Sequence, residues 1–315
     1  MRPDYFLLLS HLRVQNANLV SSPITWGFPS PTAVLGFGDA IHRSTSTELD
    51  IRVQGVGVVC HQFEPQVFRP PGKRHRVLQL TRNPVGKDGK PQALIERGRT
   101  HLEVSVVLGL SGAGLFDGRT DLASLIEERA RSMRFAGGLI LPEGRRPPVL
   151  VSADAESAEL KKLTRRLLPG FALVSRERAL ADRTAELRVK DANSTSLDAL
   201  LDFARLNFEC AQDAEDPQRG HWSIRKPRGW LVPIPCGYRA ISPLYEPGVV
   251  RHTRDATTPF RFVESIYSLG QWLSPHRVSD LTQLLWQQRY DAEHGLYRCT
   301  TPHFAQQPLM TRKEG

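Results

Sequence analysis

Cationic side chains gather in one short part of the chain. Residues 69–99 hold nine Lys and Arg against two carboxylates, a balance of +7 within a chain whose formal net charge is +9. Phosphates attract such side chains whatever the base sequence, and a basic segment flanked by strand-like residues can straddle a nucleic-acid strand. The alternative is a solvated charged loop. The density and one-sidedness of the charge favour contact with a nucleic acid.

A run of amide and hydroxyl side chains occurs much earlier in the chain. Its members are Gln15, Asn16, Asn18, Ser21 and Ser22. These groups can hydrogen-bond base edges and phosphates, and Trp26 and Phe28 just beyond them can stack on unpaired bases. Local turn chemistry with two buried aromatic rings explains the same residues equally well. The residue types alone leave both interpretations open.

Histidine is the residue type that would make this chain an enzyme acting on RNA. Metal-independent cleavage needs a general base near a 2′-hydroxyl, and His11, His61 and His101 all fall on predicted strands. A hydrogen-bonded structural histidine is the favoured interpretation for each. The sequence has no HExxH, HxH, GxSxG or GxxxxGK[ST] pattern. We therefore predict no catalytic residue, no metal site and no cofactor.

Regular elements must position these groups, and hydrophobic patterning indicates where they lie. Apolar residues at helical spacing predict helices over residues 32–43, after Pro31, and over 121–133. Apolar and β-branched runs predict strands over 5–14, 51–63, 101–110 and 134–142, the first entering a polar loop. The basic segment separates the second strand from the third, and its NPVGKDG turn between VLQL and ALIE predicts a projecting hairpin.

The order of these elements predicts an α+β fold. Strand, helix, strand, inserted hairpin, strand, helix and strand form the split β-α-β, ferredoxin-like arrangement of RNA-recognition motifs. We assign residues 1–150 to this palm, with residues 69–99 as its thumb hairpin. Residues 151–315 are predicted to form a helical and proline-rich half packed on the palm. Its expected helices cover 158–168, 197–206, 262–273 and 278–288, with irregular chain around 230–247.

Bulk properties exclude several classes of protein. The longest apolar runs, such as residues 104–108, fall far short of the roughly 18 residues that span a bilayer, so we expect no membrane association. The N-terminal apolar stretch is interrupted by Ser10, His11 and Arg13 and is a poor signal peptide. The four cysteines contain no CxxC pair, which favours free thiols in a reducing compartment. We expect a cytoplasmic protein.

Several long strings carry a resemblance to a known family. They include VQNANLVSSPITWGFPSP, GVGVVCHQFE, LTRNP, GRTHLEVSV, MRFAGG, RRLLPGFALVSRE, GWLVPIPCGY, WLSPHRV and GLYR. In their order from about residue 5 to 304, the chain resembles the second subunit of the type I-F CRISPR surveillance (Csy) complex. That family belongs to the repeat-associated RNA-binding superfamily, with a modified ferredoxin-like palm.

The resemblance implies a noncatalytic subunit that binds the 5′ handle of the CRISPR RNA. It also implies a heterodimer with the large subunit, contact with the backbone subunits, and access to target DNA through the assembled complex. RNA contact carries over to Gln15, Asn16, Asn18, Ser22, Lys73, Arg74, Arg82 and Arg99. The alternative function is a CRISPR repeat-RNA endoribonuclease, because relatives in the same superfamily cut repeat RNA with histidine.

Overall fold

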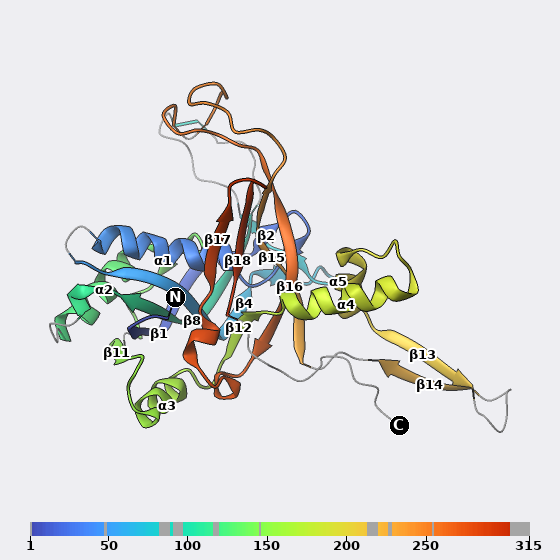
Figure 1. Ribbon diagram of the computed structural model, residues 1–315, viewed down its shortest axis with the longest axis horizontal. Coiled ribbons are helices and arrows are strands. Elements are labelled where there is room, and N and C mark those ends of the chain that lie inside the picture. Colours follow the sequence, from blue (N-terminus) through green and yellow to red (C-terminus); the bar gives the residue numbers. More distant parts are fainter. Residues whose placement is uncertain are drawn as a thin grey trace.

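A large antiparallel sheet forms the frame of the molecule (Figure 1). The computed structural model describes residues 2–46, 49–81, 89–90, 97–115, 120–144, 146–212, 220–225, 229–253 and 255–302. Within these ranges the sheet has 12 strands. The main path runs β17-β18-β15-β16-β12-β4-β8-β1-β10-β9, with β11 also paired to β1 and β7 to β8. The fold is therefore mixed α+β, as predicted.

The first half of the chain supplies the centre of this sheet. Its long elements are β1 (Tyr5–Asn18), α1 (Pro31–Thr45), β4 (Arg52–Pro65), β8 (Arg97–Ser111), α2 (Thr120–Ser132) and β10 (Gly138–Ile140). The strands lie in the order β10, β1, β8, β4, and every neighbouring pair is antiparallel. Both helices pack on one face of these strands. The predicted helices and the first three predicted strands of this half are confirmed, with ends that shift by a few residues. The strand predicted over 134–142 is instead a hairpin of two short strands, β9 (Arg134–Phe135) and β10.

A bulge at His11 explains the weak alternation of apolar residues along β1. Leu7 and Leu9 face α1 and α2, whereas beyond His11 the residues on that face are Leu12 and Val14. His11 has a positive φ of 51°, and the pairing with β8 shifts register between Leu9 and Leu12. One extra residue in a strand moves every later side chain to the opposite face unless a bulge absorbs it. The bulge therefore keeps the apolar side chains on the core side.

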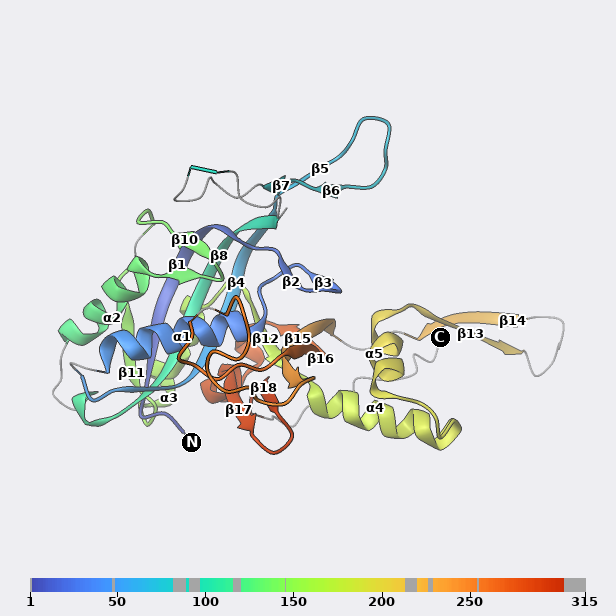
Figure 2. The same cartoon turned by 90° about the horizontal axis from the view of Figure 1, so that it is seen from above.

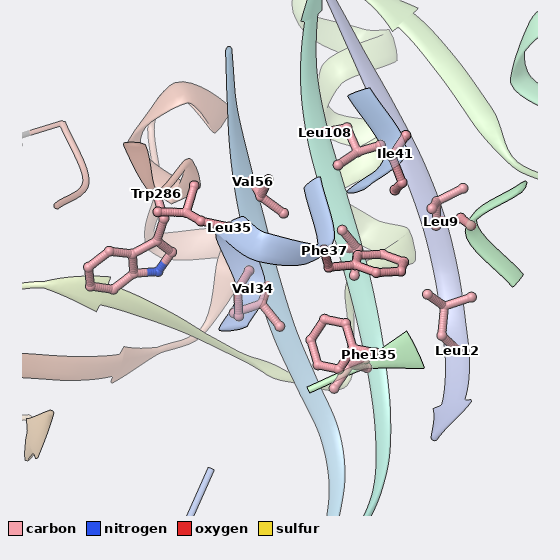
Figure 3. Packing of buried hydrophobic residues seen from close by; sticks show 14 of the residues in the cluster. Leu9, Leu12, Val34, Leu35, Phe37, Ile41, Val56, Leu108, Phe135 and Trp286 are labelled. Carbon is pink, nitrogen blue, oxygen red and sulfur yellow. The ribbon is translucent and has the colours of Figure 1, made fainter. Parts of the chain in front are cut away.

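The core between α1 and the sheet is closely packed (Figure 3). Pro31 occupies the first turn of α1, where a proline costs no hydrogen bond. Phe37 of α1 meets Phe135 edge to face, with ring centroids 5.3 Å apart. Leu9 and Leu12 of β1 and Leu108 of β8 are fully buried around these rings. This packing fixes α1 across the strands whose ends carry the candidate site.

The second half of the chain extends the same sheet. Its longer elements are β11 (Val149–Ser152), α3 (Ser157–Arg166), β12 (Phe171–Ser175), α4 (Glu177–Lys190), α5 (Ser196–Ala204), β15 (Trp230–Ala240), β16 (Val263–Leu273), β17 (Gln287–Asp291) and β18 (Leu296–Thr300). Strand β12 pairs with β4 on one side and with β16 on the other. Helix α3 packs on the face opposite α1 and α2. The helices predicted over 158–168 and 197–206 are confirmed as α3 and α5.

Two predicted helices are wrong, and neither helix α4 nor any strand of the second half was predicted. Residues 262–273 form strand β16, because pairing with β12 and β15 outweighs the helix-like spacing of Ile266, Leu269 and Leu273. Residues 278–288 contain only the short 3-10 helix η3 (Leu281–Leu284) and the start of β17. Helix α4 and the proline-containing strand β15 were missed. The second half therefore contains less helix, less irregular chain and more strand than expected.

Short elements complete the chain. They are β2 (Val20–Ser22), β3 (Thr25–Trp26), β5 (Val67–Phe68), β6 (Val77–Leu78), β7 (Leu80–Thr81), η1 (Ala113–Leu115), β9 (Arg134–Phe135), β13 (Asn207–Gln212), β14 (Gly220–Arg225) and η2 (Pro275–Arg277). Strands β5 and β6 pair and project beyond the ends of β4 and β8 (Figure 2). The predicted NPVGKDG turn falls almost wholly on residues outside the described ranges. In the described part of the chain, no helix is long and apolar enough to cross a membrane.

Candidate nucleic-acid interface

The polar residues that follow the first predicted strand do not form a loop. They belong to the last part of β1, which still pairs with β8. Asn16 has a positive φ of 57°, a conformation that asparagine tolerates better than most residues. The β1–β8 register shifts between Val14 and Ala17 at this point. As a result Gln15, Asn16 and Asn18 are all exposed at one end of the sheet.

Arg99 holds this end of β1 in place from the neighbouring strand. Its guanidinium Nη1 donates to Asn18 Oδ1 at 2.6 Å and to the Asn16 carbonyl at 3.3 Å. Gln66, just beyond β4, donates from Nε2 to Asn16 Oδ1 at 2.6 Å. The structure therefore brings Asn16, Asn18 and Arg99 together, as three of the predicted site residues. Gln15 lies beside them on β1, where it pairs with Leu139.

Like charges surround Arg99. Partial burial lowers the pKa of Arg99 below its usual range, and the positive charges of Arg97 and Arg134 lower it further. These side chains come from β8 and β9, and both neighbours are exposed. Guanidinium groups offer forked donors that suit phosphate oxygens. A phosphate at this position would relieve the mutual repulsion of the three cations.

Lys73 and Arg74 lie in a separate part of the surface. Both are exposed on the connection between β5 and β6. The Arg69 Nη2 group donates to the Arg74 carbonyl at 2.9 Å, and the Lys73 amide donates to the Pro70 carbonyl at 3.1 Å. These bonds fix the backbone of the connection, and the two side chains are exposed to solvent. Arg82 lies outside the described residues.

Ser22 has the turn role that the sequence left open. Its side chain is buried, and its hydroxyl accepts from the Thr25 amide at 3.0 Å and from the Tyr267 hydroxyl at 3.1 Å. The Thr25 hydroxyl is a further partner at 2.6 Å. Ser22 therefore closes the connection between β2 and β3. Its side chain is buried, whereas those of Asn16 and Asn18 are exposed.

Two of the three histidines form a stacked pair, in which His11 is buried and His61 is half-buried. The rings of His11 and His61 stack with centroids 4.0 Å apart and planes inclined by 17°. His11 Nδ1 lies 2.5 Å from Glu103 Oε1. His61 uses both ring nitrogens, with the Pro169 carbonyl at 2.6 Å and Ser105 Oγ at 2.7 Å. These contacts are those of structural histidines.

His101 differs because it lies at the candidate interface. Its Nε2 is 3.2 Å from Gln66 Nε2, and its Nδ1 is 3.4 Å from the Asn16 amide nitrogen. It is two residues from Arg99 on β8, so both side chains leave the same face of that strand. The sequence pattern does not distinguish this histidine from His11 and His61.

Sequence reasoning missed Arg134 and Gln66 as members of this surface. Arg134 lies 35 positions from Arg99 in the sequence. The β9–β10 turn brings it close, because the Asn18 amide donates to the Ala136 carbonyl at 2.9 Å. A side chain at Gly137, which has φ 80°, would place Cβ 3.0 Å from the side-chain Nδ2 of Asn18. The adjacent glycines of MRFAGG were the available signal for a close approach.

No cluster of three or more His, Cys, Asp or Glu in the described ranges is arranged to hold a metal ion. The chemistry available at the interface is hydrogen bonding and cation–anion attraction. The fold and this surface together define a class: an α+β protein with a cationic sheet end that is suited to a polyanionic ligand.

Comparison with known proteins places the chain more narrowly. Residues 7–299 match the family described as "CRISPR-associated protein (Cas_Csy2)". The chain is also 49% identical over 321 aligned positions to the "CRISPR-associated protein Csy2" of Pseudomonas aeruginosa (strain UCBPP-PA14), covering 98% of each chain. The chain therefore belongs to the Csy2 family of CRISPR-associated proteins.

Proposed function

We propose that this chain is a noncatalytic subunit of the type I-F CRISPR surveillance complex. It binds the 5′ handle of the CRISPR RNA and pairs with the large subunit as a heterodimer. It contacts the backbone subunits and reaches target DNA only through the assembled complex, in the cytoplasm. The observation that carries the proposal is the group of Arg97, Arg99 and Arg134 around the exposed amides of Asn16 and Asn18.

The order of the central strands supports a ferredoxin-like palm. Strands β10, β1, β8 and β4 correspond to the fourth, first, third and second strands of a split β-α-β unit, with α1 and α2 as its helices. The projecting β5–β6 segment then has the position of the thumb (Figure 2). The palm and thumb both present cations at the same end of the sheet.

The contacts of the interface support RNA as the ligand. Arginines and exposed amides are the groups that proteins use for phosphates and for the edges of unpaired bases. Lys73 and Arg74 on the thumb add phosphate contacts that carry no sequence information. RNA bound there would lie across the ends of β1 and β8.

Charge reversal on the thumb tests this function. Replacing Lys73, Arg74 and Arg76 by Glu in the full-length chain should weaken binding of a CRISPR RNA without unfolding the protein. Binding releases fewer counterions when phosphate contacts are lost. The magnitude of the slope of log affinity against log salt concentration should therefore fall by roughly 2 to 3. Titrations at several salt concentrations measure it.

A matched control lies on α3, which packs on the opposite face from α1. Lys161, Lys162 and Arg165 are exposed there, so Lys161→Glu, Lys162→Glu and Arg165→Glu remove the same number of cations. This variant should keep the wild-type slope. An unchanged slope in the thumb variant would remove the thumb from the RNA site.

An endoribonuclease remains the alternative function, and His101 is the histidine that would carry it. Cleavage would need His101 as a general base and Arg99 to stabilise the charged phosphorane. Its signature is a cut at a single position of the repeat RNA in EDTA that His101→Ala abolishes. We expect the RNA to stay intact.

A further inference from the structure

Six aromatic rings surround a cavity of about 390 Å³ beside the candidate interface. They belong to Trp26, Phe28, Phe63, Phe171, Trp230 and Trp272, which come from the β3 region and from β4, β12, β15 and β16. Among the described residues that line the cavity, none is Lys, Arg, Asp or Glu. Its lining is therefore suited to a neutral, flat, largely apolar group.

The rings are held in a fixed arrangement that leaves part of the cavity open. Phe28 and Trp272 meet edge to face with centroids 4.9 Å apart, and Phe171 and Trp230 do so at 5.5 Å. Trp26 and Trp230 nevertheless expose 62% and 55% of their surface. Large aromatic side chains so exposed next to a cavity are typical of a binding site.

Strand β4 links this cavity to the cationic cluster. Its residues His61 and Phe63 line the cavity, and Gln66, three residues further on, bonds to Asn16 at 2.6 Å. At about 3.3 Å per residue, Phe63 and Gln66 are roughly 10 Å apart. A single strand of RNA that contacts Asn16 and Arg99 can therefore reach the cavity.

A second connection runs along the loop after β1. A neighbouring, more open cavity is lined by Asn18 and Ala136 and shares Ser21 and Ser30 with the aromatic one. Asn18 accepts the 2.6 Å hydrogen bond from Arg99. The aromatic cavity is thus continuous on two sides with the surface that holds Arg99.

We propose that the aromatic cavity binds one unpaired base of the RNA, which leaves the path of the phosphates and stacks on Trp26 and Trp230. The inference rests on the proposed RNA-binding function. Every base has a π-face, and stacking on aromatic side chains tolerates any sequence, whereas the phosphates remain with the cations outside. A nonpolar side chain of a partner protein fits the rings but gives no reason for the continuity with Arg99.

A scan with the fluorescent base 2-aminopurine tests the proposal. The probe replaces one base at a time along the repeat-derived 5′ end of an RNA bound to the full-length chain. One position should be strongly quenched, because stacking on tryptophan quenches this base. Trp26→Ala and Trp230→Ala should each abolish the quench and weaken affinity roughly 5- to 150-fold, in line with the loss of one stacked base.

Two sets of variants serve as controls. Tyr290 of β17 is 64% exposed and does not line the cavity, so Tyr290→Ala should leave both the quench and the affinity unchanged. Trp26→Phe and Trp230→Phe keep a ring and should retain most of the affinity.

The outcomes separate the two proposals. If RNA fails to bind the wild-type chain, the proposed function itself is wrong. If RNA binds with the expected salt dependence but no position is quenched, only the base-binding cavity is wrong. Unchanged RNA affinity in Trp26→Ala and Trp230→Ala, with loss of a protein partner, would assign the cavity to that partner and overturn the proposal.

Discussion

Arg99 shows how much the candidate interface depends on single side chains. Its two hydrogen bonds join β8 to the irregular end of β1. The positive charges of Arg97 on β8 and Arg134 on β9 also act on it. The same guanidinium therefore has a structural and an electrostatic role. Lys73 and Arg74, in a separate part of the surface, have only an electrostatic role, because their side chains are exposed on the thumb.

The stacked histidine pair predicts a pH-dependent stability. Burial lowers the pKa of His61 from about 6.5, and the nearby His11 adds to this effect, although the hydrogen bond to Pro169 opposes it. The unfolded chain therefore binds this proton more readily than the folded chain. The contribution of His61 to stability is complete above pH 6.5 and is lost as the pH falls through its lower folded pKa.

His61→Gln should reduce this dependence. The difference in Tm of the full-length chain between pH 7.5 and pH 5.5 should be smaller in the variant than in the wild type. His75→Gln is the control, because His75 is exposed on the β5–β6 connection. Equal pH dependence in all three proteins would contradict the assigned role of His61.

At the scale of elements, α1 depends on one close approach to the sheet. A Cβ atom on Gly38 would collide with Val56 of β4, whereas Gly36, two residues earlier, has open space around it. Gly38→Ala should therefore destabilise the protein by about 1–3 kcal/mol. Gly36→Ala should stabilise it by about 0.5–1 kcal/mol, because glycine is unfavourable inside a helix.

Denaturant unfolding of the two variants measures the difference. The pair is matched because both changes add one methyl group to the same helix. Equal destabilisation by both would show that the Gly38 contact does not limit the approach of α1 to β4.

The elements that the sequence predicted are those with a strong local signal. Helix α1 has Pro31 at its start and regular apolar spacing, and β8 contains a long apolar run rich in Val and Leu. Strand β16 has apolar residues at helix-like spacing, and only its neighbours β12 and β15 decide that it is extended. Strand β15 was missed because Pro233 and Pro235 suggest irregular chain.

Part of the candidate site was predictable because its residue types give a local signal in the sequence. The cationic run of residues 69–99 and the amides of Asn16 and Asn18 are visible as residue types. The proximity of Arg134 to Arg99 arises from the β9–β10 turn, which no spacing in the sequence reveals. The register shifts that expose Asn16 depend on pairing with β8.

At the scale of the whole molecule, the two predicted halves share one sheet. The pairing of β12 with β4 crosses the proposed boundary near residue 150. The division into residues 1–150 and 151–315 stays a prediction. A thumb in the first half and a sheet edge in the second can thus keep a fixed relation to one another.

Exposed apolar residues on the β13–β14 hairpin indicate a protein partner. Phe208 pairs with Ile224, and both are exposed, as is Trp222 on the same face. The hairpin stands apart from the main sheet (Figure 1). Two-stranded hairpins are marginally stable alone, so a covering surface would stabilise this one.

Coexpression with the large subunit should therefore increase the soluble yield. Gel filtration should show the two proteins eluting together, and Phe208→Ser with Trp222→Ser should weaken that association while improving the solubility of the lone chain. A monodisperse lone chain that ignores the large subunit would argue against this surface as the heterodimer contact.

Sequencing of the RNA that copurifies with the full-length chain tests the central claim most directly. The chain would be produced together with a CRISPR array and the other proteins of its complex. The account predicts RNAs that share one repeat-derived 5′ end, whose recovery falls when Lys73, Arg74 and Arg76 are replaced by Glu. Absence of RNA, or a mixture of cellular fragments with no common 5′ end, would contradict it.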